Sequence, residues 1–153
     1  MKKILIAVDD TKGSKSAVSA GSKLCKCMNP ETVLLLYVEK FEGRSLIDEM
    51  LGAAEMETLK DVLEGTEYKN KLDEKADRIL DVYTKTLERN GVSNIKPVIK
   101  TGHPAEEILK TAKKEDVDMI IIGSRGKRVT HRFMGSVSRE VVNNSEVPVL
   151  VVR

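Results

Sequence analysis

Five short runs of apolar residues divide the chain, and each has the length of a β-strand. They occupy residues 3–8, 33–38, 96–100, 117–122 and 148–152, and the third is the weakest, with only Val98 and Ile99 at its centre. Runs that are apolar at successive positions are typical of strands with both faces buried. Such strands need helices above and below them, so the pattern predicts an α/β fold in three layers around a doubly wound parallel sheet.

Segments with apolar residues at helical spacing separate these runs. The longest places six apolar side chains on one face and ends just before Gly91, a residue that suits the end of a helix. After the first strand, the turn-like stretch 11–14 offers Ser14 as a helix N-cap. The predicted helices run from Ser14 to Asn29-Pro30 and over residues 68–90, 104–114 and 136–144.

Residues 42–66 fit neither a strand nor a simple crossover helix and are predicted to be an insertion. Apolar residues around Leu46-Ile47 and Met50-Leu51 follow helical spacing, but three glycines interrupt the pattern. The stretch is too short for a second domain. We therefore expect a single domain, 1–153, with a helical insertion at about 42–66 that serves as a flap or faces a protein partner.

The composition argues against several classes of function. Basic and acidic side chains nearly balance, 26 against 24, for a net charge of +2, and there are two Phe, three Tyr and no Trp. Nucleic-acid binders use basic patches and aromatic stacking, so this balance disfavours them. Cys25 and Cys27 point to different faces of a helix, and His103 and His131 lie in separate segments, so no metal site is predicted.

Nothing in the sequence predicts an association with a membrane. Only five apolar residues follow the first three residues before Asp9, too few for a signal peptide, and no run approaches the roughly 20 residues of a membrane span. We therefore expect a soluble, cytoplasmic protein whose cysteines stay reduced.

The fourth apolar run stops at Gly123-Ser124-Arg125-Gly126, a loop of the kind that holds phosphate. After a basic spacer, Gly135-Ser136 opens the last predicted helix. Glycines let the backbone approach a ligand, and a helix start offers unpaired N–H groups and a positive dipole end. Neither the P-loop nor the G-x-G-x-x-G pattern is present. Glycines lie on either side of the basic residues of this loop, so contact with phosphate is favoured over a merely solvated loop. The basic residues are Arg125, Lys127, Arg128, His131 and Arg132.

Polar groups gather where the predicted strands end. Asp9-Asp10 closes the first strand, Val38-Glu39 the second and Gly123 the fourth. Ligands of open α/β sheets bind beyond the carboxyl ends of the strands, so these residues are expected to converge on one crevice. We predict that Asp9 accepts hydrogen bonds from a ribose or a base and that Asp10 faces solvent. No catalytic triad or Cys-His pair is recognisable, and no catalytic residue is predicted.

Three stretches together resemble the universal stress protein family, and the resemblance covers nearly the whole chain. Residues 3–9 look like the family's first strand and its aspartate, 101–108 like the link into its third main helix, and 123–152 like its signature region. The resemblance implies the strand order 3-2-1-4-5 of adenine nucleotide alpha hydrolase-like folds. It also implies that the adenosine of ATP, or of AMP or ADP, lies between the first and fourth strands. If the chain binds ATP, Mg²⁺ or Mn²⁺ is expected to accompany the nucleotide. A homodimer would pair through Val149–Val152, an apolar strand whose edge is otherwise exposed.

The same resemblance implies individual site residues. Ala7, Val8 and Asp9 would line the adenine and ribose, and Val38 would meet the base through its main chain. The ribose and phosphates would be surrounded by Gly123, Arg125, Gly126, Gly135, Ser136, Val137 and Ser138.

The chain departs from the pattern of ATP-binding members in two respects. Eight residues, 127–134, separate Gly126 from Gly135, giving G-2x-G-8x-G-S where those members usually have nine. This change concerns the phosphate end of the site more than the adenosine end. Ala7 stands where many relatives have proline, which a main-chain contact tolerates.

Three functions follow as hypotheses. The first is a regulatory dimer that binds ATP in the stress response and needs no catalytic base. The second is an enzyme with slow ATP hydrolysis or nucleotidyl transfer, although the histidine-rich signature of such transferases is absent after Asp9. The third is a dimeric scaffold that no longer binds nucleotide. The intact glycines favour the first, with at most weak ATP hydrolysis.

Overall fold

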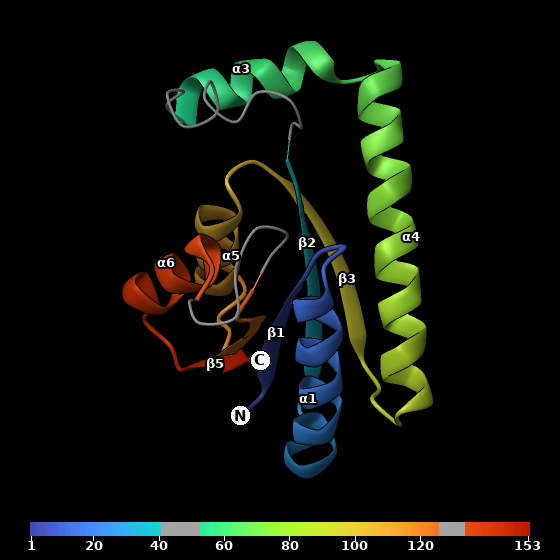
Figure 1. Ribbon diagram of the computed structural model, residues 1–153, viewed down its shortest axis with the longest axis vertical. Helices are drawn as coiled ribbons and strands as arrows, with labels where there is room; N and C mark the ends of the chain where they lie inside the picture. Colours follow the sequence, from blue (N-terminus) through green and yellow to red (C-terminus); the bar gives the residue numbers. More distant parts are fainter. Residues whose placement is uncertain (41–52, 126–133) are drawn as a thin grey trace.

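Five parallel strands form one sheet in the order β3-β2-β1-β4-β5 (Figure 1). The computed structural model describes residues 1–40, 53–125 and 134–153. The fold class predicted from the apolar runs is confirmed, as is the order implied by the family resemblance. The strands are β1 (Lys3–Val8), β2 (Thr32–Glu39), β3 (Ile95–Thr101), β4 (Met119–Gly123) and β5 (Val149–Val152).

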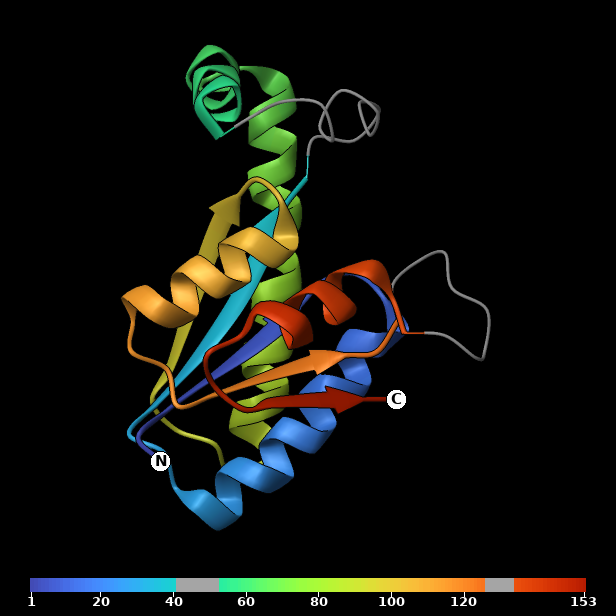
Figure 2. The same ribbon diagram turned by 90° about the vertical axis from the view of Figure 1, so that its left-hand side faces the viewer.

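Two layers of helices cover the sheet, because alternate residues of each strand face opposite sides. Helices α1 (Lys12–Met28) and α4 (Glu67–Arg89) pack on the face that carries Ile4 and Ile6. Helices α5 (Pro104–Lys114) and α6 (Ser136–Asn144) pack on the face that carries Leu5 and Ala7 (Figure 2). The central strands are therefore shielded from solvent on both faces. No helix of the described residues is long and apolar enough to cross a membrane.

The strand order reverses at β1, which pairs with β2 on one side and with β4 on the other. Ile6 stands beside Leu35 of β2 and Ile121 of β4, and all three side chains are fully buried. The chain runs outward from β1 through β2 to β3, then returns to β4 and continues to β5. The carboxyl ends of β1 and β4 therefore form the switch point where ligands bind in such sheets.

Helix α4 ends just before Gly91, as the sequence predicts. The N–H of Gly91 donates to the carbonyl of Glu88 at 2.8 Å, and the N–H of Val92 donates to that of Leu87 at 3.0 Å. Gly91 has φ +77°, the left-handed conformation that this arrangement needs and that glycine adopts without strain. Val92 and Leu87 are both buried in the same core.

The predicted start of α1 is wrong by about one turn. Thr11 is the N-cap and the helix begins at Lys12, so Ser14 lies within the first turn. The reason is that the Ser14 hydroxyl is taken up by Asp9 and does not cap the helix. The fourth strand also differs from its prediction, because it begins at Met119 and extends to Gly123, which pairs with Val152.

Helix α3 (Ala53–Leu63) accounts for the second half of the predicted insertion. It projects beyond the carboxyl edge of the sheet and leads directly into α4 (Figures 1 and 2). Thr66 links the two helices, since its hydroxyl donates to the carbonyl of Leu63 at 2.6 Å and accepts the N–H of Lys69 at 3.3 Å. Residues 41–52 lie outside the described part of the chain, including the helical pattern predicted around Leu46-Ile47 and Met50-Leu51.

Candidate functional site

Asp9 holds the chain at the carboxyl end of β1. The N–H of Thr11 donates to Asp9 Oδ1 at 2.8 Å, which forms an Asx turn, and the Thr11 hydroxyl donates to the same oxygen. The Ser14 hydroxyl donates to Asp9 Oδ1 at 2.7 Å and accepts the N–H of Asp9 at 2.7 Å. All three side-chain contacts use one oxygen, so Asp9 Oδ2 has no partner among the described residues.

Two glycines bring the start of α1 against the end of β4. A Cβ added to Gly123 would lie 2.6 Å from the carbonyl carbon and oxygen of Gly13, and one added to Gly13 would meet the carbonyl oxygen of Arg125. In both cases the added Cβ would lie closer to main-chain atoms than Cβ atoms do in real proteins. The absence of a side chain at Gly123 therefore makes room for Gly13, while its predicted contact with a ligand stays a prediction. Gly13 was not predicted as part of the site, since its contact is with a segment far along the chain.

Ser124, Gly135 and Ser138 fasten the start of α6 to the end of β4. The N–H of Gly135 donates to the carbonyl of Ser124 at 2.7 Å, and the N–H of Ser124 donates to that of Val152 at 2.7 Å. The buried Ser138 hydroxyl donates to the carbonyls of Ser124 and Gly135 at 3.2 and 3.1 Å. The hydroxyl of Ser138 therefore donates to the main chain at the end of β4 and at the start of α6.

The first turn of α6 lacks a side chain that caps it. Its N-cap is Gly135, which has none to offer, and the first helical residue, Ser136, is exposed. The first N–H groups of a helix have no partner within the helix, so they attract an anion together with the helix dipole. Helix α1 begins at the same edge, also without a side-chain cap and without an acidic residue in its first turn. Two positive helix ends thus lie at the carboxyl ends of the neighbouring strands β1 and β4, and Asp9 directly follows β1.

The predicted apolar residues of the site divide between the two faces of the sheet. Ala7, Val38 and Val137 pack in the core beneath α5 and α6, whereas Val8 packs beneath α1 and α4. Ala7 and Val8 are both buried. Val8 can therefore serve a ligand at the α6 side only through its main chain. Arg125 is partly buried where β4 ends, and Gly126 lies outside the described residues, as do the predicted basic residues at 127–133.

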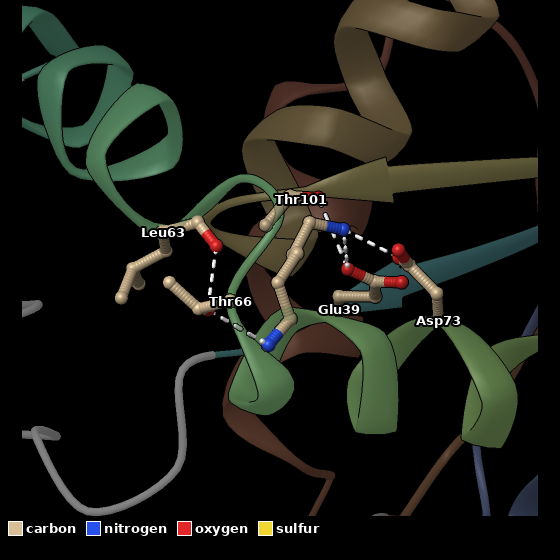
Figure 3. A network of polar contacts seen from close by, with 6 residues as sticks. Glu39, Leu63, Thr66, Asp73 and Thr101 are labelled. Carbon is tan, nitrogen blue, oxygen red and sulfur yellow. Dashed lines mark hydrogen bonds and ion pairs between the residues drawn. The ribbon is translucent and has the colours of Figure 1, made fainter.

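A buried carboxylate lies at the end of β2, at a strand end that the sequence marks as polar but to which it assigns no specific role (Figure 3). Glu39 is completely buried, and its Oε2 accepts Lys69 Nζ of α4 at 2.8 Å and the Thr101 hydroxyl of β3 at 3.2 Å. Lys69 Nζ also contacts Asp73 Oδ1. Burial raises the pKa of Glu39, and the hydrogen bond from Lys69 lowers that of Asp73. In the sequence, the only indication of this ion pair is that an acidic residue, Glu39, directly follows an apolar run.

Asp10 behaves as predicted in part, and His103 lies at the start of a helix. Asp10 is exposed, but its carboxylate also pairs with Lys75 of α4 at 3.3 Å. His103 is the N-cap of α5 and makes no side-chain capping bond. Within residues 1–40, 53–125 and 134–153, no group of three or more His, Cys, Asp or Glu side chains is arranged to hold a metal ion.

Comparison with known proteins places this geometry in one family. A model of the Universal stress protein family matches residues 1–153. The sequence is 36% identical over 156 residues to Universal stress protein MJ0577 of Methanocaldococcus jannaschii, covering 99% of this chain and 94% of that protein. The solved structure of MJ0577 superposes with a TM-score of 0.76 at 34% identity over the same shares of the two chains.

Two further solved structures share the fold at lower identity. One is a universal stress protein in complex with cAMP, 21% identical with a TM-score of 0.70, covering 99% of this chain and 97% of that one. The other is the universal stress protein from Archaeoglobus fulgidus in complex with dAMP, 17% identical with a TM-score of 0.70, covering 100% and 98%. At these identities the likeness shows the fold alone.

Proposed function

The chain belongs to the universal stress protein family, and on that premise we propose that it binds ATP and acts as a nucleotide-responsive regulatory dimer in the stress response. The observation that carries the proposal is the pair of uncapped helix starts, of α1 and α6, beside Asp9 at the switch point of the sheet. Helix starts of this kind bind phosphate.

Each part of the nucleotide has a candidate partner. The main-chain N–H groups of Ser136 and Val137, with Arg125 and Gly126, suit the phosphates. The unused Oδ2 of Asp9 suits a ribose hydroxyl, which donates a hydrogen bond to a carboxylate. Ala7 and the main chain of Val38 suit the base. The structures of relatives with cAMP and dAMP support an adenine nucleotide as the ligand class.

The residues present fit a divalent cation that arrives with the nucleotide. Mg²⁺ or Mn²⁺ beside substrate phosphates needs few protein ligands, because it keeps several of its waters and is held mainly by the phosphate oxygens. The described residues offer no larger acidic group, so most ligands would come from the triphosphate and water. The cation would neutralise phosphate charge. We expect the short spacer of eight residues to change contacts to the terminal phosphate and to leave those to adenosine intact.

The two edges of the sheet differ in a way that favours a dimer through β5. On one side of β2, the carbonyl of Asn94 accepts the N–H of Val33, and the N–H of Gly102 donates to the carbonyl of Glu39. The N–H and C=O groups of the even-numbered residues of β3 therefore face β2, and those of the odd-numbered residues face away from the sheet. Pro97 is one of the latter and has no N–H to donate. Proline at such a position protects an edge from pairing. In β5, the carbonyls of Pro148 and Val152 accept the N–H groups of Ile120 and Ser124 on the side of β4. The N–H groups of Val149 and Val151 therefore face outward, without a partner among the described residues.

Native mass spectrometry tests the proposal. The purified chain with added ATP should show a mass increase of one ATP per chain, and dimers should carry two. GTP at the same concentration should give much less adduct, which controls for non-specific attachment. Gly135→Val should abolish the adduct without loss of the circular dichroism spectrum, because a side chain there blocks the approach to the start of α6. Absence of any ATP adduct on the wild type would contradict the proposal and favour the scaffold hypothesis.

A further inference from the structure

Glu39 occupies a position where a charge is costly. Its side chain is fully buried at the end of an otherwise apolar strand, and its Oε1 has no hydrogen-bond partner among the described residues. Buried ion pairs often contribute no net stability relative to apolar residues of similar volume. The removal of one partner, in contrast, leaves an uncompensated charge and is strongly destabilising locally. A carboxylate at this point therefore indicates that it serves to link specific elements of the fold and not to add stability.

The link joins three elements beside the proposed base contact. Glu39 directly follows Val38, its carboxylate binds Lys69 of α4 and Thr101 of β3, and its carbonyl accepts the N–H of Gly102 at 3.1 Å. The side chain and the main chain of one residue thus fix the end of β2 against both neighbours. Because the main chain of Val38 is continuous with this anchor, its position depends on the Glu39–Lys69 pair.

Helix α4 contacts the other side of the site in the same manner. Lys75, about two turns after Lys69, pairs with Asp10 at 3.3 Å, and Asp10 directly follows Asp9. The helix therefore holds the residue after each of two proposed ligand contacts. Its N-cap, Thr66, is bonded to the last residue of α3, so the insertion is connected to these ion pairs through a few residues.

We propose that Glu39 and Lys69 are positioning residues that couple the α3–α4 segment to the base-binding end of the nucleotide site. The inference rests on the proposed function. Lys69 holds the carboxylate of Glu39, the anchored strand end presents the main chain of Val38 to the base, and α4 in turn fixes α3. Coupling is reciprocal, so a bound nucleotide also strengthens the docking of α4 and its attached helix.

Three variants of charged residues test the role of the Glu39–Lys69 pair. Lys69→Met removes the cation while keeping an unbranched side chain, and it leaves Glu39 with only the Thr101 hydroxyl. Lys71→Met is the matched control, since Lys71 lies on the same helix and its pair with Glu67 at 3.2 Å is largely exposed. Glu39→Gln keeps the volume of the side chain and removes its charge, and it serves if Lys69→Met does not fold.

Calorimetric titration with ATP and with inorganic tripolyphosphate provides the readout. Lys69→Met should bind ATP at least fivefold more weakly, within the roughly 5–150-fold range of coupling energies, while its tripolyphosphate affinity stays within twofold of the wild type. Glu39→Gln should show a smaller change of the same kind, and Lys71→Met none. A structural defect would weaken both ligands alike.

Three results would overturn the inference. Equal ATP affinity in the wild type, Lys69→Met and Glu39→Gln would remove the positioning role and leave the proposed function standing. Parallel loss of ATP and tripolyphosphate binding would assign the pair to general stability. A wild type that binds no ATP would overturn the proposed function and this inference together.

Discussion

Gly123→Ala should destabilise the protein because two backbones meet at this glycine. The new Cβ would lie 2.6 Å from the carbonyl group of Gly13, whereas ordinary contact begins at 3.4 Å, so the start of α1 and the end of β4 would separate by about 0.8 Å. Gly123 is not among the described glycines with positive φ, so alanine fits the local conformation and the cost is steric. Overpacking of this kind costs about 1–3 kcal/mol.

The expected loss is measurable by thermal unfolding without ligand. At about 2 kcal/mol, the Tm of a chain of this size falls by about 4–8 °C, which circular dichroism at 222 nm resolves. Gly21→Ala is the matched control, because its Cβ would lie at a similar 2.7 Å but from the Cδ1 tip of Ile6, which can rotate. Alanine also gains about 1 kcal/mol over glycine within a helix. The reasoning is refuted if Gly123→Ala melts within about 1 °C of the wild type, or if Gly21→Ala is equally harmful.

Three further predictions concern other parts of the fold. Two main-chain N–H groups at the start of β1 hold the pKa of Asp118 below its ordinary value, so its stabilising contribution is present at neutral pH and lost as the pH falls through that lowered pKa. Urea unfolding should show Asp118→Asn less stable than the wild type at pH 7, with a difference that disappears as the pH falls through the lowered pKa. Ser138→Ala should cost about 1 kcal/mol in the same assay, since its hydroxyl bonds two buried carbonyls, whereas Ser136→Ala at the exposed helix start should cost almost nothing. Val151→Pro should convert the proposed dimer to a monomer in analytical ultracentrifugation, because proline removes an outward N–H of β5; a dimer that persists would place the interface elsewhere.

The strands and helices were predictable because their signals are local. Successive apolar residues in β1, β2 and β4 require cover on both faces, and Gly91 marks the end of α4 through its positive φ. The strand order is a different matter, since apolar runs do not specify which strands are neighbours. It was implied by the family resemblance and then confirmed by the pairing of β1 with both β2 and β4.

The parts of the site that the sequence missed depend on contacts between distant segments. Gly13 matters because of Gly123 and Arg125, more than 100 residues later, and Glu39 because of Lys69, which follows the insertion. Ser14 was misassigned for a related reason. A serine after a turn suits an N-cap, but the carboxylate of Asp9 competes for its hydroxyl, and the N-cap is Thr11, three residues earlier.

Hydrogen–deuterium exchange with and without ATP tests most directly whether the carboxyl ends of β1 and β4 hold the nucleotide. We predict slower exchange, on addition of ATP, in peptides that contain residues 7–14, 123–125 and 134–139. Peptides at the amino ends of the strands, such as those around residues 115–118 just before β4, should exchange at unchanged rates. Protection that is absent at saturating ATP, or that appears only outside these segments, would contradict the proposed site.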